Sequence, residues 1–255
     1  MKFGCCVDVS QLPLVLKSGF DFAELRVGTV APDITHDEWA PIRDEILSRN
    51  VPILGFNVLL PGHLRVVGPD VNWTALTDYV DIAFARMSQL GGKYLSFGSG
   101  GARRIPEGFD RATAEGQLRN FVSMLGEKGL QYGITVNVEF LNRKETNVIL
   151  SLLEAKRYVA AANVPSVKLL ADFYHMMEET EPLNDLREVS DDLGYVHVAD
   201  SGRRYPGSGQ YPYIEFARTL REIKYDGPVS VECTWGENLA RELEESSAYL
   251  RSVFR

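Results

Sequence analysis

The chain has 255 residues, of which 45% are hydrophobic and 24% are charged, an ordinary composition for a soluble globular protein. A chain of this length can bury a sizeable core without disulfides or structural metals, and we expect residues 1–255 to form a single domain. The net charge of −8 argues against nucleic acid as a partner, because an acidic surface repels phosphate backbones.

Cysteine usage and hydrophobicity predict a cytoplasmic protein that does not contact membranes. The three cysteines, Cys5, Cys6 and Cys233, form no secretory framework and indicate reduced thiols. Cys5 and Cys6 lie in an apolar stretch, where we expect them to pack. That stretch is too short for a signal peptide, and no segment approaches the roughly 18 apolar residues that a membrane helix needs.

Short apolar runs alternate with longer amphipathic segments along the whole chain. The predicted strands are Lys2–Val7, Phe22–Val27, Val51–Asn57, Lys93–Gly98, Ile134–Phe140, Val167–Phe173, Gly194–Ala199 and Pro228–Cys233. The segments with helical periodicity include Asp37–Ser48, Thr74–Leu90, Thr113–Lys128, Val148–Ala162, Ile214–Ile223 and Glu237–Val253. This order predicts βα units around a parallel sheet.

Eight strands, with a helix after almost every one, favour an α/β fold of the (β/α)₈ TIM barrel type, for which about 250 residues is typical. The alternative is a doubly wound sheet, which often carries a glycine-rich G-x-G-x-x-G turn after its first strand when it binds dinucleotides. Here the first strand runs into Asp8-Val-Ser instead. We therefore predict the barrel.

Each of the last four predicted strands presents an ionisable residue near its carboxyl end. These residues are Glu139, Asp172, His197 and Glu232. They are about 25–35 residues apart, close to the length of one βα unit. Active sites of TIM barrels lie at the carboxyl ends of the strands, so the four side chains should point into one mouth.

Three carboxylates buried together would repel one another, and a divalent cation among them would resolve that conflict. A set of oxygen ligands with one histidine nitrogen suits Mn²⁺, Mg²⁺ or Co²⁺ better than an ion that prefers thiolates. We predict one divalent metal ion, with Mn²⁺ favoured and Zn²⁺ left open.

Four motifs carry a resemblance to a known family. They are E-F-L-N-R-K-E-T at 139–146, D-F-Y-H-M at 172–176, H-V-A-D-S-G-R-R-Y-P-G at 197–207 and V-S-V-E at 229–232. In these motifs and their order, the chain resembles the xylose-isomerase-like TIM barrel superfamily. Within it, the chain is most similar to ketose 3-epimerases of the tagatose/psicose epimerase type.

The resemblance implies roles for individual residues. It implies metal ligation by Glu139, Asp172, His197 and Glu232. Glu139 and Glu232 would double as the acid/base pair. It further implies that Glu145, His175 and Arg203 contact the substrate. Arg203 is preferred to its neighbour Arg204 because it lies six residues after the implied ligand histidine, as in the corresponding loop of the family.

The implied activity is isomerisation or epimerisation of a small ketose or ketose phosphate. A proton next to a ketone is too weakly acidic to be removed at neutral pH unless the developing enediolate is stabilised, which a metal can do. One glutamate would remove the proton and the other would return one. The only partner predicted is this small-molecule substrate, and a homo-oligomer is left open.

Three other functions remain as alternatives. A keto-inositol dehydratase, which is a lyase, uses a similar metal site and a similar proton abstraction. An abasic-site endonuclease needs a histidine-rich cluster of three metals, whereas this chain has four histidines in all. A non-catalytic sugar-binding barrel is disfavoured because both glutamates and the whole ligand set are present.

The segment Phe97–Arg104 combines glycines with two arginines after the fourth strand. Backbone N–H groups and a guanidinium could cradle a phosphate there. We favour a tightly turning loop in which Arg103 and Arg104 are solvated. Glu24 and Asn57 lie near the ends of the second and third strands, where they could line the pocket.

Overall fold

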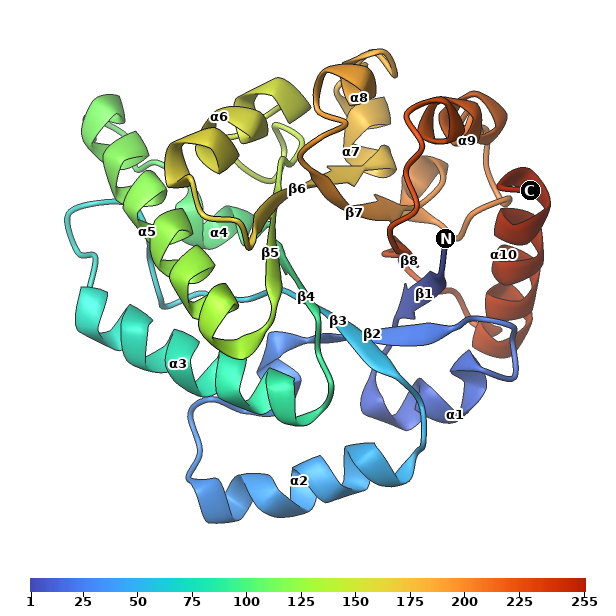
Figure 1. Cartoon of the computed structure of the whole chain (residues 1–255), viewed down its shortest axis with the longest axis horizontal. Coiled ribbons are helices and arrows are strands. Elements are labelled where there is room, and N and C mark those ends of the chain that lie inside the picture. The colour runs from blue at the N-terminus through green and yellow to red at the C-terminus, as the bar shows by residue number, and fades with distance from the viewer.

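The computed structural model describes all 255 residues, and its strands form a closed parallel barrel in which β8 pairs with β1 (Figure 1). The strands are β1 (Phe3–Cys6), β2 (Phe22–Arg26), β3 (Ile53–Asn57), β4 (Tyr94–Phe97), β5 (Thr135–Glu139), β6 (Val167–Asp172), β7 (Leu193–Val198) and β8 (Val229–Val231). The α-helices are α1 (Leu12–Val15), α2 (His36–Ser48), α3 (Trp73–Gln89), α4 (Gly100–Arg103), α5 (Arg111–Tyr132), α6 (Leu152–Ala162), α7 (Phe173–Glu178), α8 (Asp185–Glu188), α9 (Tyr213–Glu222) and α10 (Leu239–Val253). The 3₁₀ helices are η1 (Val9–Gln11), η2 (Val27–Val30) and η3 (Ser201–Arg203).

The predicted (β/α)₈ barrel is confirmed, and every predicted strand is present with its ends shifted by at most two residues. The helix predicted over Val148–Ala162 is too long at its start. It begins at Leu152, because Ile149 has a left-handed backbone (φ 56°) and the side chain of Ser151 accepts a hydrogen bond from the backbone of Glu154 as an N-cap.

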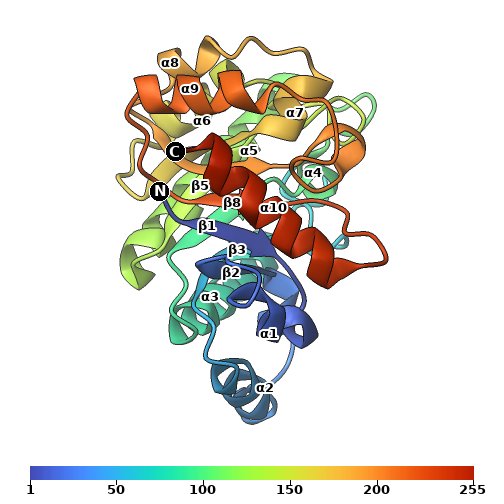
Figure 2. The same ribbon diagram turned by 90° about the vertical axis from the view of Figure 1, so that its right-hand side faces the viewer.

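The helices surround the barrel, and the two ends of the chain lie close together (Figures 1 and 2). The ring of Phe3 on β1 contacts the ring of Phe254, just after α10, with centroids 5.7 Å apart. This contact joins the last helix to the first strand. No helix of the chain combines the length and the apolar character that crossing a membrane requires.

Alternation along each strand separates the core from the site. In β5, Val136 and Val138 belong to the main hydrophobic core between barrel and helices, whereas Asn137 and Glu139 alternate with them and so point to the barrel interior. The other strands follow the same rule. Most apolar side chains of the strands therefore lie on the outer face, and the polar residues near the strand ends point to the interior.

The barrel interior is layered. A small apolar cluster of Phe22, Leu170 and Tyr195 fills its lower part. Two residues further along the same strands come Glu24, Asp172 and His197, all buried. Strand register aligns the upper layer, because Asp172 pairs with His197 across β6 and β7. The carboxyl ends of the strands thus carry a buried layer of ionisable groups on an apolar floor.

Candidate active site

The four predicted metal ligands lie together at the carboxyl ends of β5, β6, β7 and β8. One ligand atom from each of Glu139, Asp172, His197 and Glu232 lies within 4.8 Å of all the others. The Nδ1 atom of His197 is 3.5 Å from Oε1 of Glu139 and 3.8 Å from Oε2 of Glu232. Glu232 follows the last residue of β8 and is partly exposed, while the other three are buried.

The donor set fits a divalent cation. Oε1 of Glu139 and Nδ1 of His197 are buried without a hydrogen-bond partner, although buried polar atoms are almost always paired. Burial raises the pKa of Glu139. Burial alone would lower the pKa of His197, but the carboxylates of Glu24 and Glu232 outweigh it and raise that pKa well above its usual range. The cluster therefore attracts positive charge, which a divalent ion would supply.

Glu232 is held from two sides. Nδ2 of Asn57 donates to its Oε1 at 2.9 Å, and Nη2 of Arg203 donates to its Oε2 at 2.8 Å. Burial would raise the pKa of Glu232, but the positive charges of His197 and Arg203 prevail and lower it. Glu232 is thus oriented as a carboxylate at the edge of the cluster.

Arg203 also reaches the loop after β5. Its Nη1 donates to Oε1 of Glu145 at 2.8 Å, and its guanidinium lies over the ring of Tyr174, 5.0 Å from the centroid. The neighbouring Arg204 instead bonds the carbonyl of Ser208. Of the two arginines, only Arg203 contacts the predicted site residues, and it joins Glu145 to Glu232.

The two carboxylate oxygens of Asp172 have different surroundings. Oδ1 accepts hydrogen bonds from the backbone N–H groups of Tyr174 (2.7 Å) and His175 (3.3 Å), and it thereby caps α7. Oδ2 lies 3.7 Å from Nε2 of His175. Nδ1 of His175 accepts from the backbone N–H of Asn142 at 3.3 Å, so the ring carries a proton on Nε2, which has no hydrogen-bond partner.

A pocket of about 450 Å³ opens beside the cluster. Its lining comes from the ends of β1, β2 and β3 and from the segments after β7 and β8: Cys6, Val7, Asp8, Gln11, Glu24, Arg26, Asn57, Val58, Arg203, Glu232, Cys233, Thr234 and Trp235. Glu24 and Asn57 line it, as predicted from their positions. Cys6 was expected only to pack, but its Sγ faces this pocket and lies 3.3 Å from Nδ2 of Asn57.

The prediction that Arg103 is solvated is wrong. Arg103 ends the short helix α4 and is completely buried, with Nη1 donating to the backbone carbonyls of Glu139 (2.7 Å) and Phe97 (3.3 Å). Burial lowers its pKa to about 10. The glycines of this segment allow close packing, since a Cβ on Gly98 would lie 2.3 Å from Oε2 of Glu139.

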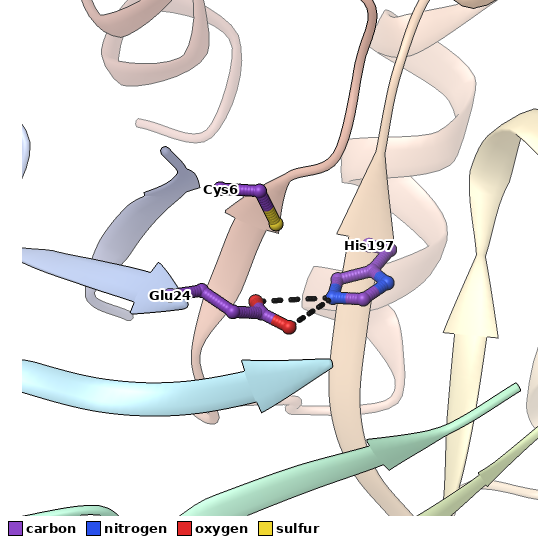
Figure 3. A group of neighbouring side chains, drawn as sticks. All are labelled: Cys6, Glu24 and His197. Carbon is purple, nitrogen blue, oxygen red and sulfur yellow. Dashed lines mark hydrogen bonds and ion pairs between the residues drawn. The ribbon is translucent and has the colours of Figure 1, made fainter. Parts of the chain in front are cut away.

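The contact between Glu24 and His197, a predicted metal ligand, was not predicted. The two carboxylate oxygens of Glu24 lie 3.0 and 3.1 Å from Nε2 of His197 (Figure 3). Glu139 and Glu232 are near the other ring nitrogen, Nδ1. The sequence placed Glu24 at a strand end, but only barrel closure brings β2 opposite β7.

Comparisons with known proteins identify the family of this chain. Residues 12–253 match the family described as xylose isomerase-like TIM barrel. The ketose 3-epimerase of Arthrobacter globiformis is 32% identical over 146 residues, which cover 56% of this chain and 50% of that protein. The 3-dehydro-D-guloside 4-epimerase of Escherichia coli (strain K12) is 34% identical over 145 residues, covering 56% and 54%. The chain thus spans about half the length of these relatives.

Solved structures show the same fold. The D-psicose 3-epimerase of Clostridium cellulolyticum H10, solved with D-tagatose, superimposes with a TM-score of 0.86 over 100% of both chains at 19% identity. A 3-keto-D-glucoside 4-epimerase from E. coli gives a TM-score of 0.84 over 99% of both chains at 22% identity. At these identities the likeness concerns the fold.

Proposed function

Because the chain belongs to the xylose isomerase-like TIM barrel family, we propose that it is a divalent-metal-dependent isomerase or epimerase of a small ketose or ketose phosphate. The observation that carries this proposal is the cluster of four ligand residues with two unpartnered buried atoms. The cluster adjoins a pocket whose volume is in the range of small-molecule sites. The relatives named as epimerases of ketoses and keto-glycosides support the same reaction class.

Glu139, Asp172, His197 and Glu232 would hold the ion, with Mn²⁺ favoured. When bound, the ion supplies positive charge that stabilises the enediolate formed when a ketose loses its α proton. The chain's own residues orient the ligand groups: Asn57 and Arg203 fix the carboxylate of Glu232, and Arg103 fixes the backbone of Glu139.

Glu139 and Glu232 would perform the proton transfers. They come from strands three apart around the barrel, so they can reach a carbon bound between them from opposite sides. One carboxylate takes the proton from the carbon next to the carbonyl, and the other returns a proton on the opposite face, which inverts that centre. Return to the neighbouring carbon gives aldose–ketose isomerisation instead. Glu145, His175 and Arg203 would contact the sugar oxygens.

Turnover of a panel of free and phosphorylated ketoses in D₂O with Mn²⁺ tests this proposal. We expect one member of the panel to be converted, with deuterium appearing at the inverted carbon. Glu139→Gln and Glu232→Gln should each abolish turnover while circular dichroism remains unchanged. Glu237→Gln is a matched control, because Glu237 is exposed in the segment after β8 and outside the pocket lining. Near-normal turnover by either site variant would contradict the two-glutamate mechanism.

The same assay separates the alternatives. A dehydratase would release water and give a product lighter by one water molecule, which mass spectrometry detects. The endonuclease alternative gains nothing from the structure, since His36 and His63 are exposed and the cluster contains one histidine. A sugar-binding barrel without activity would bind a ketose but incorporate no deuterium.

A further inference from the structure

Glu24 is a buried acidic residue of the barrel interior that the proposed reaction does not use. It is completely buried on β2, and its oxygens accept hydrogen bonds from Oη of Tyr195 at 2.9 Å and from Oγ of Ser96 at 3.3 Å. His197 is its only ion-pair partner, and no lysine or arginine contacts it. A buried carboxylate in this position is costly unless its partners compensate it.

The barrel interior leaves room for this carboxylate. Gly55 faces it from β3, and a Cβ on Gly55 would lie 3.0 Å from Cγ of Glu24 and 2.6 Å from Oη of Tyr195. Any larger residue at position 55 would therefore collide with Tyr195 and crowd the side chain of Glu24. Glu24, Tyr195 and Gly55 together form a fixed support behind the ring of His197.

The support determines which nitrogen of His197 carries a hydrogen. A carboxylate offers only acceptors, and both oxygens of Glu24 lie within hydrogen-bond distance of Nε2, as Figure 3 shows. Nε2 must therefore donate, so Nδ1 is the nitrogen whose lone pair can bind a cation in place of a proton. Nδ1 is the unpartnered atom that faces Glu139 and Glu232. The same contact stops the ring from turning.

We propose that Glu24 is a positioning residue that fixes the tautomer and orientation of His197 and thereby strengthens binding of a divalent cation. This inference rests on the metal site of the proposed function. Carboxylates that accept from the second nitrogen of a ligand histidine commonly change metal affinity by 10–100-fold. Cys6 lies within 4.8 Å of the same groups, but Nε2 of His197 is already engaged by Glu24, so we assign no second metal site there.

Calorimetric titration of the full chain with Mn²⁺ measures the effect. Glu24→Leu removes the acceptor and should weaken Mn²⁺ binding by about 10–100-fold. Glu24→Gln keeps one acceptor oxygen for His197, while its amide can donate to Tyr195. This variant should therefore lose less affinity than Glu24→Leu. Asp8→Asn is the matched control, since it removes one negative charge from the same pocket without touching His197, and should change affinity less than twofold.

Nitrogen NMR of the unmodified chain reports directly which ring nitrogen of His197 carries a hydrogen, which a merely structural role of Glu24 would not determine. This measurement does not depend on whether a variant folds. With Zn²⁺ bound, the spectrum of His197 should show a hydrogen on Nε2 and metal ligation at Nδ1, and Glu24→Gln should retain this pattern. A hydrogen on Nδ1, or affinities of both Glu24 variants equal to that of the unmodified chain, would overturn the inference. Absence of any divalent-ion binding by the unmodified chain would refute the metal site of the proposed function itself.

Discussion

Gly98 lies against the carboxylate of Glu139, and its replacement by alanine tests how finely that carboxylate must be placed. The added Cβ would lie 2.3 Å from Oε2 of Glu139, whereas such contacts in proteins essentially never fall below 3.0 Å. The carboxylate must therefore move by about 1 Å. Misplacement of a reacting group by that distance costs roughly 100-fold in rate.

The fold should tolerate Gly98→Ala because the atom in the way is the end of a side chain, and Gly98 does not have a left-handed backbone. We expect the melting temperature to change by a few degrees, about 1 kcal/mol or less. Turnover of the ketose identified in the panel should fall about 100-fold, and Mn²⁺ affinity should fall with it.

Gly101→Ala is the matched control for this experiment. Gly101 belongs to the same segment, and a Cβ there would meet no atom within 4 Å. It should leave turnover and Mn²⁺ affinity unchanged. If Gly98→Ala retained turnover and Mn²⁺ affinity within threefold of the unmodified chain, neither would depend on the position of the Glu139 carboxylate described above.

Two further predictions concern stability. Asp172→Asn keeps the oxygen that caps α7 but loses the charge of the predicted metal ligand. Its melting temperature without metal should therefore stay close to that of the unmodified chain. Adding Mn²⁺ at 100 times the Kd should stabilise the unmodified chain by about 2.7 kcal/mol, and this stabilisation should disappear in Asp172→Asn. An undiminished stabilisation would exclude Asp172 as a ligand. Burial raises the pKa of Glu181 from 4.5 to about 7, so between these pH values the folded chain holds a proton that the unfolded chain has released. The free energy of unfolding should therefore fall by up to about 3 kcal/mol as the pH rises from 4.5 to 7. Denaturant titrations from pH 4.5 to 8 should show this loss in the unmodified chain but not in Glu181→Gln, and equal slopes in the two would contradict the assignment.

The sequence predicted the barrel well because strands and helices leave local periodic patterns. It also predicted that Glu139, Asp172, His197 and Glu232 meet, since each lies at a strand end and a closed barrel brings those ends together. The short helices α1, α4, α7 and α8 span four to six residues, too few for a recognisable period.

Contacts between distant segments could not be predicted in the same way. Arg103 resembles a loop arginine in the sequence, yet its partner is the backbone carbonyl of Glu139, 36 positions further along. Backbone acceptors leave no trace in residue identity. Glu24 and His197 are 173 positions apart, and their contact depends on side chains that cross the barrel interior.

The pocket and the predicted metal site draw mainly on different halves of the chain. Asp8, Arg26 and Val58 border the pocket from the first three βα units, while the ligand cluster belongs to the last four. Under the proposed function, substitutions in the early loops would therefore alter substrate preference without replacing any predicted metal ligand. A library confined to these three positions would test that separation.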